Sequence, residues 1–199
     1  MKNFLRKIIL AVLIAIVLFT MTSMSPAQEE PSSFGCERTV EKPSEETKIN
    51  YSNEIHVLVT PEQREKIQKQ VDDLEEEIEM LAKVIYREAR GQSLDGQAAV
   101  VWCVLNRVDA DGYGDTIKKV ITSPNQFAWY PNTPVWDEHI EMATDVVTRW
   151  LLEKEGFKEV GRVLPNDYLF FGGDGKQNWF RQKFKSNGIF WDWSLESPY

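Results

Sequence analysis

The apolar run from Ala98 to Leu105 constrains the fold of this chain more than any other feature of its sequence. It lies inside a predicted helix, residues 95–108, and carries an apolar side chain at nearly every position. A helix at a protein surface has one apolar stripe, whereas a helix that is apolar all round is buried. The sequence therefore predicts that this helix is buried on most of its surface. Near its end, Asn106 and Arg107 are expected to act as internal hydrogen-bonding braces.

The segment before the buried helix carries a second apolar pattern. Thr60 is a predicted helix cap, and apolar residues then recur at alternating four- and three-residue steps over residues 61–85. Such a stripe is typical of a coiled coil. We expect this lead-in helix to pack on its own domain, and a weak homodimer through helix 61–85 is the alternative.

Shorter elements are predicted farther along the chain. One helix covers residues 116–121, a long helix covers 137–155, and a strand that starts at Tyr168 runs into a glycine turn over 172–175 before a returning strand at 179–180. The predicted fold class is therefore α+β and predominantly helical, with a small β element near the C-terminal end.

A single carboxylate, Glu88, stands near the end of the apolar helical run that precedes the buried helix. A carboxyl group flanked by apolar surface tends to stay protonated near neutral pH, because burial disfavours the charged form. A protonated carboxyl can give its proton to a leaving oxygen. Glu88 is therefore a candidate general acid, and the alternative is a structural ion pair with Lys83, Arg87 or Arg90.

Short motifs follow Glu88 along the chain. They are Glu88-Ala89-Arg90-Gly91, Gly-Gln-Ala-Ala-Val at 96–100, Leu-Asn-Arg-Val at 105–108 and Ser-Pro-Asn-Gln-Phe at 123–127. In this order and spacing they resemble the SleB-type spore cortex-lytic cell wall hydrolases, over a little more than half of the chain. The resemblance implies a lysozyme-like or lytic-transglycosylase-like fold, cleavage of the peptidoglycan glycan strand, and Glu88 as the catalytic acid.

Two positions depart from the pattern of that family. Many relatives have a second glutamate directly after Glu-Ala-Arg-Gly, where this chain has Gln92. Relatives also often close with Gly-Asn-His-x-Phe, whereas residues 186–191 contain no histidine. These departures keep open an alternative of another class, a wall-binding protein without turnover.

The number of available carboxylates bears on the reaction type. A glycosidase that hydrolyses its substrate ordinarily uses two carboxyl groups. The sequence shows no obvious second carboxylate at a fixed spacing from Glu88 that could act as its partner. The other candidates, Asp95, Asp137 and Asp174, are in predicted loops or helix starts. A lytic transglycosylase needs one glutamate, first as acid and then as base on the C6 hydroxyl of the sugar. The residues and the resemblance favour a lytic transglycosylase that cuts between N-acetylmuramic acid and N-acetylglucosamine, with hydrolysis by an N-acetylmuramidase as the alternative.

Two segments are candidates for contact with the sugars. The amide of Gln126 could hold an N-acetyl or hydroxyl group, and the ring of Phe127 could lie against a sugar or plug the core. Tyr168 and the glycines Gly172 and Gly173 are predicted to form the opposite lip of the groove, because backbone without a side chain can approach a ligand closely.

Several functional classes are not expected. The net charge of −8 argues against nucleic acid, whose phosphates would be repelled. The two histidines, His56 and His139, are far apart, and the acidic residues of 72–79 lack the spacing of a calcium loop. We expect no metal and no cofactor, and peptidoglycan as the partner.

The N-terminal part of the chain has the composition of a targeting segment and a linker. Basic residues precede an apolar stretch at 8–19, and small residues lead up to Ala27. The stretch is shorter than the roughly 20 residues of a membrane span, so residues 1–27 are predicted to be a signal peptide. This implies a transient membrane contact and a secreted or wall-associated protein, or a membrane-anchored one if the leader is retained.

The remainder divides into a linker and one domain. Residues 28–59 have the composition of a flexible linker, although 51–59 alternate like a short strand. Residues 60–199 are the predicted cell wall hydrolase domain. Cys36 and Cys103 are expected to be free thiols.

Overall fold

The computed structural model describes residues 47–51, 55–185 and 188–199, with the side chains described from Val59 onward. Contacts divide the chain into residues 1–42 and 43–199, and every described residue belongs to the second unit. The predicted leader, most of the predicted linker and Cys36 lie outside the described residues. None of the described helices is both long and apolar enough to span a membrane.

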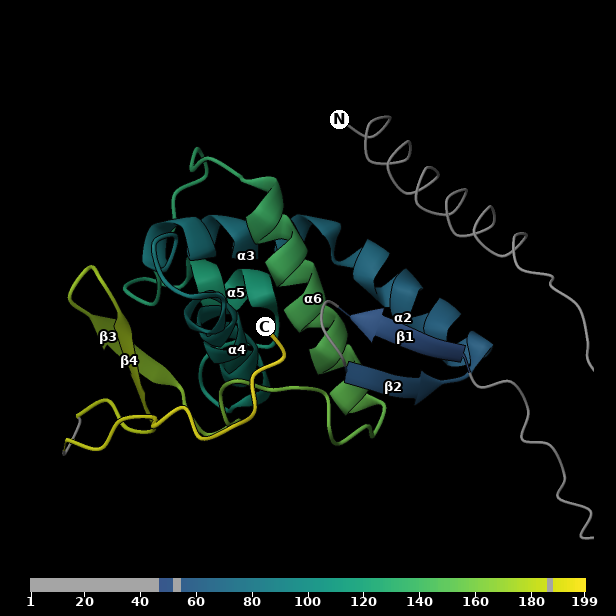
Figure 1. Ribbon diagram of the computed structural model, residues 1–199. Helices are drawn as coiled ribbons and strands as arrows, with labels where there is room; N and C mark the ends of the chain where they lie inside the picture. The colour runs from purple at the N-terminus through teal and green to yellow at the C-terminus, as the bar shows by residue number, and fades with distance from the viewer. Residues whose placement is uncertain (1–46, 52–54, 186–187) are drawn as a thin grey trace, which may run out of the picture. The chain divides into compact units, whose positions relative to one another are not determined.

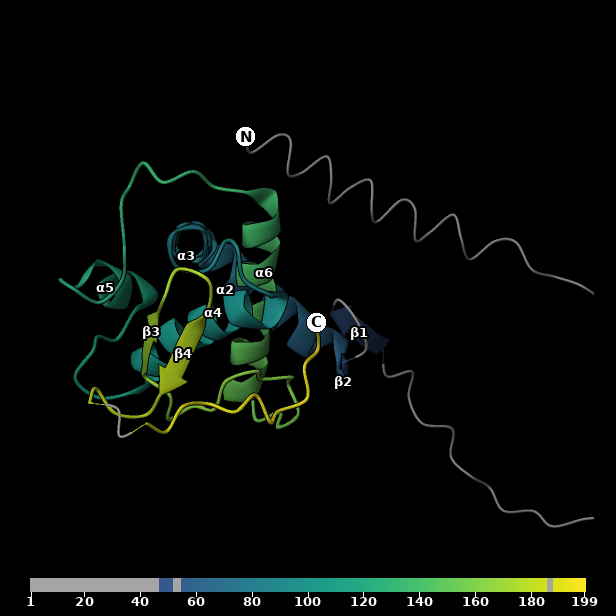
Figure 2. The ribbon, with the colours of Figure 1, turned by 60° about the vertical axis from the view of Figure 1, so that its left-hand side comes forward.

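The domain is built mainly from helices (Figures 1 and 2). They are α2 (Pro61–Asp73), α3 (Glu75–Glu88), α4 (Leu94–Asp109), α5 (Ile117–Thr122) and α6 (Asp137–Lys154). Helices α3, α4 and α6 pack on one another, α2 packs on α6, and α5 packs on α3 and α4. These bounds agree with the predicted helices except at the lead-in helix.

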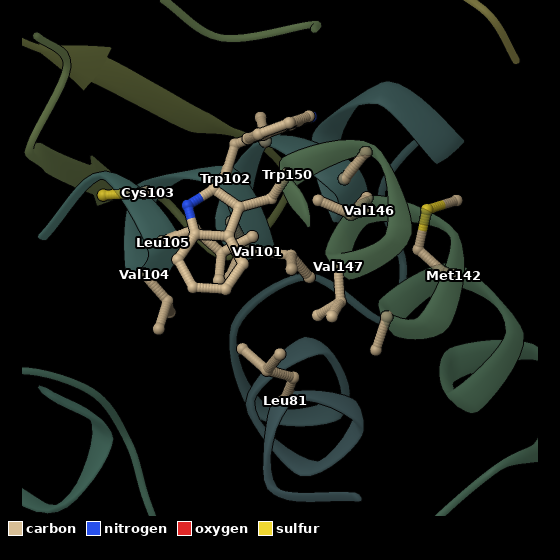
Figure 3. Close-up of a cluster of buried hydrophobic side chains, with 14 of the residues drawn as sticks. Leu81, Val101, Trp102, Cys103, Val104, Leu105, Met142, Val146, Val147 and Trp150 are labelled. Carbon is tan, nitrogen blue, oxygen red and sulfur yellow. The ribbon is translucent and has the colours of Figure 1, made fainter. Parts of the chain in front are cut away.

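The apolar run of α4 is the centre of the core. Every side chain from Ala98 to Leu105 is 0% exposed, which confirms the prediction that this helix is buried on most of its surface. Figure 3 shows Trp102 of α4 among side chains of the same core, which include Leu81 of α3 and Trp150 of α6. Apolar contacts on every face therefore fix the direction of α4, and with it the position of its polar last turn.

The predicted single helix over 61–85 is wrong in one respect, because it is interrupted at Leu74. The backbone of Leu74 leaves the helical region, with φ −100° and ψ 14°. No glycine or proline marks this break in the sequence. Both halves of the apolar stripe are buried on their own domain, as Ile67 in α2 and Leu81 in α3 illustrate, which confirms the interpretation of packing within the chain. The homodimer through helix 61–85 remains a prediction.

Helix starts follow the predicted chemistry. Thr60 and Gln63 form a capping box, in which each side chain bonds the backbone N–H of the other residue. Thr116 accepts a hydrogen bond from the N–H of Lys119 at the start of α5. These caps replace helical hydrogen bonds that the first turn cannot make.

Two antiparallel hairpins complete the domain. Strands β1 (Thr47–Tyr51) and β2 (Ile55–Val59) pair with each other, so the strand predicted within 51–59 is confirmed. The flexible linker predicted over 28–59 extends too far toward the C-terminus, because its last part is paired in this hairpin.

The second hairpin lies near the C-terminal end and joins β3 (Phe170–Gly173) to β4 (Asn178–Arg181), as Figure 2 shows. The predicted β element is confirmed, but it begins two residues later than Tyr168. Gly172 and Gly173 are paired within β3 and do not form the turn, which contains Gly175 at φ +85°.

Candidate active site

Glu88 is the last residue of α3, and its side chain is half-buried. The loop after α5 passes its carboxylate, and the backbone N–H of Ala128 donates to Oε1 of Glu88 across 2.6 Å. Among the described residues, no hydrogen bond reaches the other carboxylate oxygen. One oxygen is therefore held in place while the second is left for another partner.

The structural alternative for Glu88, an ion pair with a neighbouring cation, is not observed in the described part of the chain. Lys83 pairs with Glu79, and the Arg87 guanidinium lies 4.9 Å from the centre of the Tyr130 ring. The guanidinium of Arg90 lies over the ring of Tyr86, which is in α3. Each nearby cation thus has a different contact. The carboxylate of Glu88 is not used to hold the helix together.

Arg107, at the polar end of α4, braces the loop that carries Ala128. Its Nη1 donates to Oε1 of Gln126 across 2.9 Å, and its Nε donates to the carbonyl of Leu169 across 2.7 Å. Its guanidinium also lies 4.6 Å from the centre of the Phe127 ring. The predicted bracing role is confirmed for Arg107.

Asn106 is also a brace. Its Nδ2 donates to the carbonyls of Pro165 and Tyr168, and its Oδ1 accepts from Arg162. The two polar residues at the end of α4 therefore tie the core helix to the chain just before the C-terminal hairpin.

Gln126 and Phe127 lie in the loop that contacts Glu88, next to Ala128. Their positions agree with the prediction, but both have internal contacts. The amide oxygen of Gln126 is occupied by Arg107, and the ring of Phe127 packs on the core, 6.0 Å from the ring of Phe171. Both side chains are partly exposed, and their contact with a sugar remains a prediction.

Tyr168 does not have the position predicted for it. Its side chain is only 8% exposed, and its ring packs 5.3 Å from that of Trp191. A ring buried to this extent has little surface for a sugar, so Tyr168 supports the fold and not the lip of a groove.

Asn178 is the residue that the sequence did not reveal. It opens β4 opposite Gly173, is 7% exposed, and donates from Nδ2 to the backbone carbonyl of Glu88 across 3.1 Å. Gln92 donates from Nε2 to the same carbonyl across 3.2 Å and accepts the backbone N–H of Asn178 at its Oε1, also across 3.2 Å. Gln92 was noticed only as a departure from a family pattern, and no local signal marks Asn178.

Other reactive side chains are remote from this role. Burial raises the pKa of the Cys103 thiol to about 12, so Cys103 is not a nucleophile near neutral pH. Within the described residues, no group of three or more histidine, cysteine, aspartate or glutamate side chains is placed to hold a metal ion. Glu88 lies where the end of α3 meets the loop of Ala128 and the β3–β4 hairpin, and its carboxylate is the candidate acid at this place.

The profile of the Cell Wall Hydrolase family matches residues 91–189 of the chain. Residues 91–189 therefore form a domain of the cell wall hydrolase family. The match covers α4, the loop that holds Glu88 and the hairpin of Asn178. It begins at Gly91, three residues after Glu88, so the cell wall hydrolase match itself does not include the candidate acid.

Two curated relatives are named spore cortex-lytic enzyme. The protein of Oceanobacillus iheyensis is 32% identical over 78 residues, which are 37% of this chain and 28% of the relative. The protein of Halalkalibacterium halodurans is 36% identical over 73 residues, which are 37% of this chain and 21% of the relative. The matched part is thus about a quarter of each relative. No solved structure matches the chain, and its mostly helical architecture with a small hairpin fits the lysozyme-like fold expected for a cell wall hydrolase.

Proposed function

We propose that this cell wall hydrolase cleaves the peptidoglycan glycan strand between N-acetylmuramic acid and N-acetylglucosamine, with Glu88 as acid and then as base. The observation that carries the proposal is the state of the Glu88 carboxylate. It is half-buried, one of its oxygens is oriented by the N–H of Ala128, and no described cation pairs with it. A group placed in this way is suited to proton transfer.

In the first step, the protonated Glu88 gives its proton to the glycosidic oxygen. The bond from C1 of the muramyl sugar to that oxygen breaks, and N-acetylglucosamine leaves with a free 4-hydroxyl. In the second step, the Glu88 carboxylate takes the proton of the muramyl C6 hydroxyl, and O6 bonds to C1. The product is a 1,6-anhydro sugar, and Glu88 is protonated again for the next cycle.

The surroundings of the other candidate carboxylates support a reaction with one glutamate. Asp174 accepts the backbone N–H groups of Lys176 and Gln177, which lowers its pKa and fixes it in the hairpin turn. Asp95 accepts a hydrogen bond from Ser197, and Asp137 lies in the first turn of α6. Within the described part of the chain, none of these carboxylates shares a hydrogen bond with Glu88, so we favour transglycosylation over hydrolysis.

The site of action follows from the predicted leader. Peptidoglycan lies outside the cytoplasmic membrane, and the basic and apolar pattern of residues 1–27 is that of an export signal. We therefore infer that the protein acts as a secreted or wall-associated enzyme, or from the membrane surface if the leader is retained.

The test is a mass spectrum of the muropeptides released from purified peptidoglycan, spore cortex included. Glu88→Gln is the diagnostic variant, and Glu79→Gln is the matched control, since Glu79 lies on the same helix, is exposed and pairs with Lys83. We expect anhydro-muropeptides from the unmodified chain and from Glu79→Gln, and none from Glu88→Gln. Products with reducing ends would indicate hydrolysis, and binding to walls without any product would indicate a wall-binding protein.

A further inference from the structure

We propose that Gln92 and Asn178 are positioning residues for Glu88, acting as an amide clamp on its backbone carbonyl. The term amide clamp here means the side-chain amides of these two residues. This inference rests on the proposed function, because it assigns a role in the same reaction. It concerns the backbone of the acid and not its carboxylate.

The clamp exists because α3 ends at Glu88. The last carbonyls of a helix have no partner within the helix. The N–H of Gln92, which would bond the Glu88 carbonyl in a continuing helix, instead donates to the carbonyl of Ala89 across 2.9 Å. The Glu88 carbonyl receives the two side-chain amides in its place, at 3.2 Å from Gln92 and 3.1 Å from Asn178.

The Gln92 side chain also bonds the backbone of Asn178, which makes the clamp a closed unit. Oε1 of Gln92 accepts the backbone N–H of Asn178, while Nε2 of Gln92 donates to Glu88. The backbone carbonyl of Gln92 is in turn bonded by the side chain of Gln97 in α4. In this chain the amide of Gln92 can both donate and accept, whereas an ionised carboxylate has no donor for the Glu88 carbonyl.

The glycine opposite Asn178 leaves the space that the clamp requires. A Cβ on Gly173 would lie 2.3 Å from Oδ1 of Asn178 and 2.9 Å from the carbonyl of Gln177. A Cβ on Gly172 would meet only the end of the Arg181 side chain, at 3.3 Å. Gly173 therefore serves the site by letting Asn178 reach Glu88, which is a different role from the sugar contact predicted for it.

The clamp and the loop hold Glu88 at two points. The N–H of Ala128 fixes the carboxylate, and the amide clamp fixes the backbone from which the side chain extends. A displacement of about 1 Å in a reacting group can lower a rate by roughly 100-fold. Loss of the clamp should therefore lower kcat and leave substrate binding unchanged, since the clamp bonds the backbone of Glu88 and not its carboxylate.

The test uses the full chain and its Gln92→Met, Asn178→Leu and double variants, which remove the donors at similar side-chain volume. Assays are run well below the lowest Tm. We expect kcat to fall about 10- to 100-fold in each single variant, with KM within about twofold, and no further fall in the double variant. Gly173→Ala should behave like Asn178→Leu, while Glu79→Gln, which changes an exposed side chain of α3, keeps kcat.

The carbonyl carbon of Glu88, observed by NMR, reports on the clamp without any activity. Its chemical shift should move in both single variants and stay unchanged in Glu79→Gln. An unmoved shift, an unchanged kcat, or a fall in kcat that follows the unfolded fraction would each overturn the positioning role. If the unmodified chain and Glu79→Gln are active while Glu88→Gln is not, such a result leaves the proposed function standing. An unmodified chain without turnover would overturn the proposed function and, with it, the positioning role, whatever the carbonyl shift shows.

Discussion

The apolar core around α4 and the polar rim around Glu88 are held together in different ways. The polar rim is defined here as Glu88, Gln92, Arg107, Asn178 and the loop of Ala128. In the core, a fully buried side chain touches many others, and each contact is weak. In the polar rim, single hydrogen bonds join residues that are 40 to 90 positions apart in the sequence. Damage to the core should therefore appear as lost stability, and damage to the rim as lost turnover.

The largest loss of stability is expected from a cavity in the core. Leu105 is 0% exposed, so Leu105→Ala should lower the free energy of unfolding by about 2–5 kcal/mol. Denaturant unfolding measures this change. Because Leu105 lies in the apolar core and is not part of the polar rim, kcat per folded molecule should be retained. A lost kcat in a folded Leu105→Ala protein would contradict the separation of core and rim.

Arg107 belongs to both regions, so its replacement should affect both measurements. Arg107→Met leaves the Leu169 carbonyl and the Gln126 amide oxygen without their donor, which should cost about 1–3 kcal/mol. It also releases the loop that orients Glu88, so kcat should fall. Arg149→Met is the control, since Arg149 is equally buried and bonds Asp145 and a loop carbonyl away from the rim. Equal losses of kcat in Arg107→Met and Arg149→Met would contradict the separation of core and rim.

A pH dependence of stability is expected from His139, which is 0% exposed. Burial lowers the pKa of His139 below its usual 6.5, and nearby Glu138 offsets this in part. Below about pH 6.5 the unfolded chain binds a proton that the folded chain does not. The free energy of unfolding therefore decreases as the pH is lowered, by at most about 1.4 kcal/mol per pH unit.

The difference between the unmodified chain and His139→Phe isolates this contribution, because all other groups titrate in both. As the pH is lowered from 7.5 to 5.5, the free energy of unfolding of the unmodified chain should decrease relative to that of His139→Phe. A constant difference over this range would contradict the assignment to His139.

The smallest effect is expected at the start of α2, far along the chain from the rim. Thr60→Ala removes the side-chain acceptor of the capping box and should cost about 1 kcal/mol. Turnover should be unchanged, and Thr60→Ser should restore the stability. A change in kcat here would show that α2 takes part in the site.

The same contrast explains what could be predicted from the sequence. The burial of α4 and the stripe of α2 and α3 follow from periodic apolar residues, which are local information. The interruption at Leu74 has no local signal, because it follows from packing both helices on α6. Glu88 was found because its motif is short and continuous.

The polar rim could be predicted only in part. Arg107 stands at the end of an apolar helix, where a charged residue must have internal partners. Asn178 is an ordinary residue at a strand start, and its importance comes from a partner 90 positions away. The two glycines of β3 resemble turn residues, and only the pairing with Trp179 and Asn178 shows that they lie in the strand.

The buried thiol of Cys103 can be used as a probe for the opening of the core. Its thiol is fully enclosed in α4, and burial raises its pKa to about 12, so a thiol reagent cannot reach it in the folded state. In a chain with Cys36→Ser, labelling would take place at this single position and only when α4 is exposed. With a reagent that labels the open state faster than it recloses, the labelling rate would give the lifetime of the closed core, and variants of the rim around Glu88 could be compared by it.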